Sequence, residues 1–135
     1  MDYRSVPSIC PYCGCGCGVL LQVIDGELVK VLPSKSNPVN KGSLCIKGWN
    51  MHQFVNSDMR LKAPLIRLNG RFARATWDKA IDVAAQKLRS VVERHGPESV
   101  GVLVSAKVTN EENYLAQKLA RAALGTNNVD HCARL

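Results

Sequence analysis

Three cysteines lie in one short glycine-rich stretch, and a fourth lies further along the chain. Cys10, Cys13 and Cys17 are close together, and Cys45 stands alone in the run Cys-Ile-Lys-Gly. Four cysteine thiolates are the usual ligand set of a [4Fe–4S] cluster, and the known ligand patterns cluster most of them in one loop. We therefore expect these four cysteines to bind such a cluster.

The glycines between the cysteines have an expected conformational role. We expect Gly14, Gly16 and Gly18 to adopt positive φ, because glycine reaches that region without steric cost and the loop must turn three sulfurs toward one centre. Their N–H groups would be free to face cluster sulfurs, which tunes the reduction potential. Cys15 alternates with the ligands and should point away, although it could replace Cys17 as a ligand.

Two other uses of cysteine fit the pattern less well. Structural zinc sites pair Cys-x2-Cys with a second such pair or with two histidines, whereas Cys45 has no Cys or His after it until His52. A disulfide framework requires an oxidising compartment, and no feature of the sequence indicates one.

Composition limits the classes of partner. The chain has 135 residues and a formal net charge of +7, but its Lys and Arg are scattered and form no basic arm, so we expect no nucleic-acid binding. The positive excess would offset an anionic cluster and a phosphate-bearing cofactor. The sequence shows no signal peptide and no apolar run near the roughly 20 residues of a membrane span, which predicts a cytoplasmic location and no membrane partner.

The first half of the chain predicts a small hairpin unit. Asp25-Gly26 is a two-residue turn signal between two apolar runs. Burial alone would not stabilise so small a unit, so we expect the metal centre to hold it together. The expected elements are strands over residues 19–24 and 28–32, a loop over 33–41, and a helix over about 47–55 that buries Trp49 and Phe54.

The second half predicts one turn of an α/β winding. The first expected elements are a hairpin of residues 65–68 and 71–74 around Asn69-Gly70, and a helix over 77–95 between Thr76 and Gly96. A strand over 99–104, buried on both faces, is expected next. A last helix is expected from the capping box Thr109–Glu112 to about residue 124, with Leu115 and Leu119 pointing inward. No neighbouring strand is expected after it. The fold class is therefore α/β, an α+β Fe–S domain (residues 3–59) followed by an incomplete α/β domain (residues 60–135).

Longer motifs resemble a known family. The four cysteines, the run Cys45-Ile46-Lys47-Gly48, the run of residues 109–114 and the ending of residues 125–135 resemble the N-terminus of the molybdenum- or tungsten-bis(pyranopterin guanine dinucleotide) oxidoreductases. Within that family they look most like the catalytic subunit of formate dehydrogenase. The resemblance implies a small [4Fe–4S] hairpin domain followed by the first part of a Rossmann-like domain.

The resemblance also implies roles for individual residues. Lys47 would be an electron relay between cluster and pterin, its ammonium stabilising the reduced states of both, although a solvated lysine at a helix start is the simpler alternative. Lys107 and Asn110 follow the expected buried strand, where open α/β sheets bind phosphates, and so would face the pterin nucleotide. An ordinary polar loop is an equally good interpretation of that segment.

The resemblance places the catalytic ligand outside this chain. In the family a metal-ligating cysteine or selenocysteine follows the Ala-Arg-Leu motif, so no catalytic residue is expected within the chain and one is expected immediately after Leu135. We hypothesise that an in-frame UGA codon lies there; an arbitrary boundary is the alternative. Cys132 is expected to be a packed cysteine rather than a ligand.

The implied reaction is oxidation of formate to CO2, or the reverse. This segment would carry the [4Fe–4S] cluster that relays electrons singly, while a Mo- or W-bis(pyranopterin guanine dinucleotide) is shared with the remainder of the subunit. The implied partners are that remainder and an Fe–S or flavin electron-transfer subunit. Two alternatives are the same segment of a nitrate reductase or formylmethanofuran dehydrogenase, and a stand-alone ferredoxin-like carrier.

Overall fold

The computed structural model describes residues 1–132, so the expected Ala-Arg-Leu motif at residues 133–135 lies outside the described residues. The chain divides into two units, which are described separately. The first consists of residues 1–60 together with 105–113, and the second of residues 61–104 and 114–132. The secondary structure is mixed α/β, as the sequence predicts.

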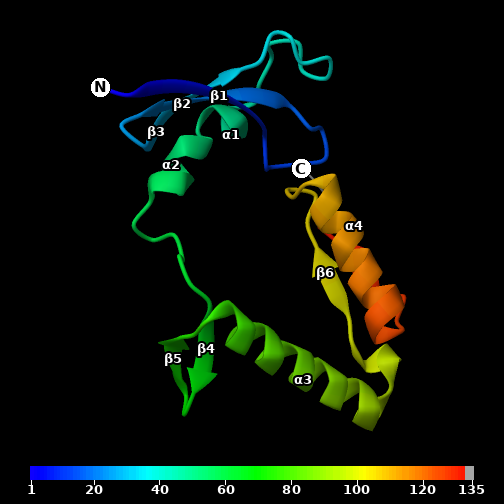
Figure 1. Ribbon diagram of the computed structural model, residues 1–135. Helices are drawn as coiled ribbons and strands as arrows, with labels where there is room; N and C mark the ends of the chain where they lie inside the picture. Colours follow the sequence, from blue (N-terminus) through cyan, green and yellow to red (C-terminus); the bar gives the residue numbers. More distant parts are fainter. Residues whose placement is uncertain (133–135) are drawn as a thin grey trace. The chain divides into compact units, whose positions relative to one another are not determined.

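The first unit is built on a three-stranded antiparallel sheet in the order β1-β2-β3 (Figure 1). Its strands are β1 (Tyr3–Ile9), β2 (Gly18–Ile24) and β3 (Glu27–Pro33). The turn between β2 and β3 has φ of 49° at Asp25 and 87° at Gly26, the two positive values that a type I′ turn needs. The predicted hairpin is thereby confirmed.

Strand β1 is not among the elements expected from the sequence. All seven of its residues are exposed, so it has no buried face and no apolar alternation to reveal it. It also contains Pro7, which sheets tolerate on an edge strand. Its register pairs Ile9 with Gly18, so the cysteine loop is the connection of a β1–β2 hairpin.

Two short helices replace the single expected helix. They are α1 (Ile46–Trp49) and α2 (Met51–Asn56), and both contact β3 (Figure 1). The break falls at Asn50, which has non-helical φ and ψ and whose side-chain amide donates to the Ile46 carbonyl at 2.8 Å. The expected burial of Trp49 is wrong, since that residue is 38% exposed.

A small apolar core lies under the sheet and includes one of the expected ligands. The buried residues that form it are Cys10, Val19, Leu28, Val31 and Met51. Tyr12 and Cys17 of the cysteine loop pack against this cluster, as does Phe54 of α2, which is half-buried. The cysteine loop is therefore continuous with the core of the first unit.

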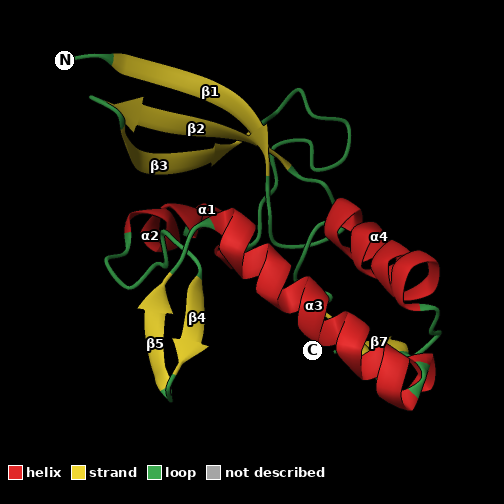
Figure 2. Ribbon diagram, turned by 60° about the horizontal axis from the view of Figure 1, so that its bottom comes forward, coloured by secondary structure: helices red, strands yellow, loops and turns green. Residues whose placement is uncertain are grey.

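The second unit begins with the predicted hairpin and long helix (Figure 2). Strands β4 (Leu65–Leu68) and β5 (Arg71–Arg74) pair around a turn with positive φ at both central residues. Helix α3 (Trp77–His95) begins at Thr76, whose hydroxyl accepts a hydrogen bond from the Lys79 N–H at 3.3 Å. It ends at Gly96, where φ is 82°.

The buried parallel strand is shorter and more exposed than expected, and it has a neighbour. Strand β6 (Val102–Val104) pairs in parallel with β7 (Val129–His131), so the expectation of no following strand is wrong. The Asn128 side-chain amide donates to the Glu98 carbonyl at 3.0 Å, which joins the segment before β7 to the segment before β6. Leu103 is 86% exposed, so β6 is not buried on both faces within the described residues.

The last helix follows the predicted capping box but changes character along its length. Helix α4 (Asn110–Lys118) continues into a π-helix over Leu119–Leu124 and ends at Gly125, where φ is 75°. Leu115 and Leu119, expected to point inward, are exposed.

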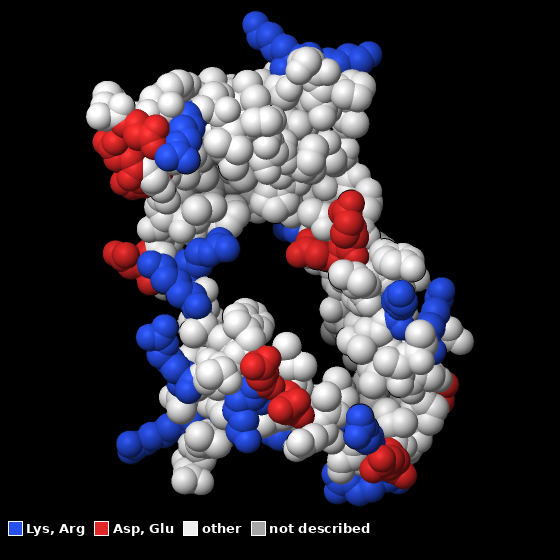
Figure 3. All heavy atoms as spheres, viewed as in Figure 1, with Lys and Arg blue, Asp and Glu red and all other residues white. Residues whose placement is uncertain are grey.

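Two surface properties bear on partners. On the face seen in Figure 3, Lys and Arg side chains are dispersed and form no continuous basic surface. Among residues 1–132, none of the helices combines the length and apolar character that crossing a membrane requires.

Two valines of strand β3 differ in burial, so their truncation should cost different amounts of stability. Val31 is fully buried, whereas Val29 is 42% exposed. We expect Val31→Ala to lower the free energy of unfolding by about 2 kcal/mol, because it leaves a cavity in a small core. Val29→Ala is the matched control and should cost less than about 0.5 kcal/mol. The measurement is the urea midpoint of unfolding under anaerobic conditions. Equal losses of stability in the two variants would contradict the observed packing of Val31.

Candidate metal centre

The β1–β2 hairpin brings the first and third expected ligands together. At the end of the strand ladder the Cys10 N–H donates to the Cys17 carbonyl at 2.8 Å, which closes the base of the loop. Cys10 is 5% exposed and Cys17 is half-buried, so both are held by the core. Cys13 lies between them in the loop and is half-buried.

A second loop holds the cysteine hairpin before the chain reaches Cys45. The Asn40 side chain bonds both polar groups of the Gly18 backbone, accepting from its N–H at 2.9 Å and donating to its carbonyl at 3.1 Å. The Ser34 N–H donates to the same carbonyl at 2.9 Å. The chain then reaches Cys45, which is exposed and is the N-cap residue of α1.

The thiols are near enough to affect one another electrostatically. Burial is the main cause that raises the pKa of the Cys10 thiol, and the neighbouring Cys45 and Cys13 thiols raise it further. Burial likewise raises the pKa of Cys17, with added repulsion from all four other thiols of the region. Several thiolates in this place are therefore unfavourable unless a cationic centre accompanies them.

Cys45 differs because a helix start faces it. The backbone N–H of Gly48 is the main cause that lowers the pKa of the Cys45 thiol, and the N–H and charge of Lys47 act in the same direction. The Lys47 charge also favours the thiolate of Cys10. The half-buried Lys47 ammonium therefore lies within electrostatic range of two of the four expected ligands.

A single metal ion and an iron–sulfur cluster place different demands on the ligand side chains. Among the described residues, no three His, Cys, Asp or Glu side chains are close enough to hold one metal ion. A tetrahedral zinc site needs sulfurs only about 3.8 Å apart, whereas each cysteine of a cubane binds a different iron.

The glycines of the loop act differently from the expectation. Only Gly16 has positive φ, at 69°, so the conformational prediction is wrong for Gly14 and Gly18. At these two positions a side chain would collide with an asparagine: a Cβ would lie 2.4 Å from the side chain of Asn110 or Asn37. At both positions another segment approaches the backbone closely, so an added Cβ would have to displace an asparagine side chain.

The remaining expected residues are not gathered into one site. Cys15 is exposed, as is the expected ligand Cys45, and Cys132 is exposed rather than packed. Lys107 is exposed, and its backbone N–H donates to the Ser105 hydroxyl at 3.0 Å. The side-chain amide of Asn110 donates to the Gly14 carbonyl at 2.9 Å, a contact that the sequence did not predict.

Aromatic side chains support the loop and were also not foreseen. The rings of Tyr12 and Phe54 meet edge to face with centroids 5.8 Å apart, and the Arg60 guanidinium lies 5.2 Å from the Phe54 centroid. Tyr12 stands between two ligand cysteines in the sequence, which could have indicated this role.

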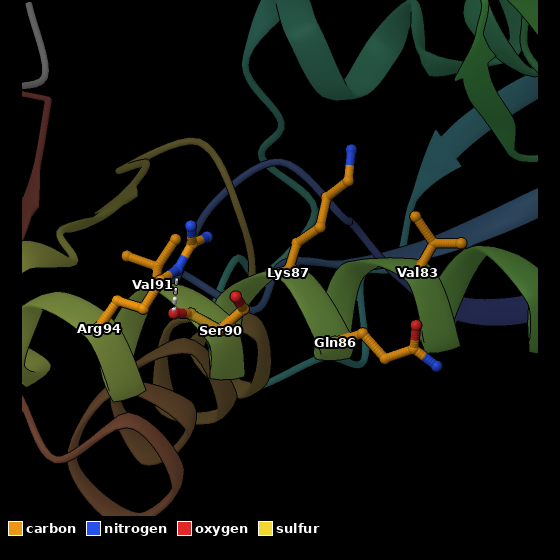
Figure 4. A pocket seen from close by; sticks show the side chains of 6 residues that line it. All are labelled: Val83, Gln86, Lys87, Ser90, Val91 and Arg94. Carbon is orange, nitrogen blue, oxygen red and sulfur yellow. Dashed lines mark hydrogen bonds between the residues drawn. The ribbon is translucent and has the colours of Figure 1, made fainter.

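A hollow elsewhere offers no comparable chemistry. It has a volume of about 470 Å³ and is lined by α3 alone, where Arg94 bonds the Ser90 carbonyl of its own helix at 3.1 Å (Figure 4). No cysteine or carboxylate lines it, so the cysteine loop remains the candidate site. Its lining residues are Val83, Gln86, Lys87, Ser90, Val91 and Arg94.

Comparisons with known families agree with the two halves of the chain. Residues 3–57 match the family described as molybdopterin oxidoreductase Fe4S4 domain, and residues 60–135 match the family described as molybdopterin oxidoreductase. The first match contains all four expected ligands.

Individual relatives are longer than this chain. It is 53% identical, over all 135 residues, to the F420-dependent formate dehydrogenase 1 subunit alpha of Methanococcus maripaludis, and 47% identical to the F420-dependent formate dehydrogenase subunit alpha of Methanocaldococcus jannaschii. The chain spans 19% of the length of each. Among solved structures, acetylene hydratase from Pelobacter acetylenicus resembles it with a TM-score of 0.70 and 26% identity, covering 95% of this chain and 18% of that one.

The thiol electrostatics predict a pH order of reactivity in the metal-free protein. Because the pKa of Cys45 is lowered and that of Cys17 is raised, the Cys45 thiolate forms at lower pH. Iodoacetamide labelling followed by peptide mass analysis should therefore give a lower pH midpoint for Cys45 than for Cys17. In urea the two midpoints should coincide. The same order persisting in urea would mean that the folded structure is not its cause.

Proposed function

The chain belongs to the molybdopterin oxidoreductase family, and on that premise we propose that it is the N-terminal part of a formate dehydrogenase catalytic subunit. The proposed reaction is oxidation of formate to CO2, or its reverse. The observation that carries the proposal is the 53% identity to a formate dehydrogenase alpha subunit over every residue of the chain.

We propose that Cys10, Cys13, Cys17 and Cys45 each bind one iron of a [4Fe–4S] cluster. The match of residues 3–57 to the molybdopterin oxidoreductase Fe4S4 domain and the closed β1–β2 loop support this ligand set. When bound, such a cluster accepts and releases electrons one at a time. The chain holds two of the sulfurs against its core and presents Cys45 at the start of α1.

Lys47 is proposed as the electron relay residue between cluster and pterin. Its charge favours the thiolates of Cys10 and Cys45, so it acts where negative charge accumulates on reduction. It does so from the first turn of α1, where it is half-buried and therefore less screened by water than a surface lysine.

Lys107 is proposed to bind a phosphate of the pterin nucleotide. It lies just after β6, at the carboxyl end of a parallel strand, and its exposed ammonium has no ion-pair partner among the described residues. Asn110 is three positions further on and was expected to face the same nucleotide. The proposed cofactor is Mo- or W-bis(pyranopterin guanine dinucleotide), held mainly by the remainder of the subunit.

The proposed partners are that remainder and an Fe–S or flavin electron-transfer subunit, in the cytoplasm. The decisive experiment is an anaerobic assay of formate-dependent viologen reduction by the full-length subunit. Cys45→Ser should abolish the cluster signal in electron paramagnetic resonance and reduce turnover strongly. A fully loaded enzyme that ignores formate but reduces nitrate would refute the proposal in favour of a sister enzyme.

The Lys47 role predicts a defect in turnover without loss of the cluster. Lys47→Ala should leave the iron content unchanged and slow formate-dependent dye reduction by roughly ten-fold, as expected for a loss of about 1.4 kcal/mol of charge stabilisation. Lys47→Arg keeps the charge and is the control. Turnover unchanged in Lys47→Ala with a full complement of iron would refute the relay role.

A further inference from the structure

The cysteine loop is bonded to a residue almost a hundred positions away. The Asn110 side-chain amide donates to the Gly14 carbonyl at 2.9 Å, and both residues belong to the first unit. Gly14 directly follows the expected ligand Cys13. The contact therefore acts on the backbone of the ligand loop itself.

Asn110 can reach the loop because its neighbours cap the helix. The Thr109 N–H donates to the Glu112 carboxylate at 2.7 Å, and the Glu112 N–H donates to the Thr109 hydroxyl at 3.3 Å. This reciprocal capping box satisfies backbone donors at the start of α4 without using Asn110. The Asn110 amide is then available for a contact outside its own helix.

The fit between the two residues is steric as well as polar. A Cβ on Gly14 would lie 2.4 Å from the Asn110 Oδ1 atom and 3.1 Å from its Cγ atom. Gly14 does not have positive φ, so an alanine there meets no backbone obstacle. The three atoms nearest to such a Cβ all belong to the side chain of Asn110.

The opposite end of the loop is held in a similar way. Asn40 bonds both backbone polar groups of Gly18, next to Cys17. Two asparagines from distant segments thus hold the loop at Gly14 and Gly18, on either side of Cys15 and Cys17.

We propose that Asn110 is a positioning residue for the iron–sulfur cluster, fixing the loop at Gly14 so that the ligands beside it keep their geometry. The inference rests on the proposed cluster ligation by Cys10, Cys13, Cys17 and Cys45. By restraining the loop, Asn110 limits the local openings through which oxidants reach the cluster. It acts through the backbone and touches no reacting atom.

The test is a double-mutant cycle in the full-length subunit. Gly14→Ala alone should lower the cluster content and the melting temperature, because its Cβ collides with Asn110. Asn110→Ala alone should retain the cluster but alter its electron paramagnetic resonance g-values. Its visible absorbance should decay roughly three-fold faster in air, which is the size of effect expected when one exposed hydrogen bond is lost. The double variant should recover much of the cluster lost in Gly14→Ala.

Two controls isolate the contact. A Cβ on Gly16 would meet open space, but the backbone there has φ of 69°, which strains any residue other than glycine. The defect of Gly16→Ala should therefore come from the backbone alone and should not be rescued by Asn110→Ala. Glu111→Gln changes the same helical turn without touching the loop and should leave the cluster unaltered.

The outcomes separate three cases. Additive effects of Gly14→Ala and Asn110→Ala in a subunit that binds iron overturn this inference alone. The inference is also overturned if Asn110→Ala lowers the pterin content but leaves the g-values and the air stability of the cluster unchanged. That result would favour a contact between Asn110 and the pterin nucleotide instead. A wild-type subunit that binds no iron overturns the proposed function, and this inference with it.

Discussion

The burial of cysteine side chains beside one another in a single hairpin loop is the constraint on which the candidate site of the first unit depends. The pKa of Cys10 and that of Cys17 are raised by burial and, after it, by their neighbouring thiols, so forming these two thiolates costs free energy. In the proposed cluster a cationic iron centre would convert that cost into attraction, because each thiolate would then face a metal rather than another anion. The core that accompanies the site is small, so the proposed ligation would be strongly coupled to folding.

The backbone frame around the thiols explains which residues the site requires. Hairpin pairing between β1 and β2 closes the loop through Cys10 and Cys17, and the start of α1 favours the Cys45 thiolate. The side chains of Asn110 and Asn37 occupy the space beside Gly14 and Gly18 that a Cβ would need. The loop is glycine-rich chiefly because other segments lie against it, and only at Gly16 because the chain must turn with positive φ.

Local signals predicted much of the fold. Asp25-Gly26, Thr76 with Gly96, and the Thr109–Glu112 capping box each act through neighbours a few residues away, and each was located correctly. Strands β1 and β7 were missed because their identity comes from pairing with β2 and β6 rather than from their own apolar pattern. Burial was overestimated for Trp49, Leu103 and Leu115 because periodicity shows which face is apolar and not what covers it.

At the site, too, local signals could be found in the sequence and long-range contacts could not. The four cysteines could be proposed as ligands from residue type and spacing, whereas the hydrogen bond from Asn110 to Gly14 could not be predicted, since nothing in either local sequence refers to the other. Those two residues are separated by 96 positions, which has a consequence for the order of folding. The sheet and its cysteines involve only short-range closures and can form early during synthesis, whereas the Asn110 bond must await a much longer stretch of nascent chain. During synthesis the β1–β3 sheet and its cysteines can therefore fold before the last restraint on their loop is in place.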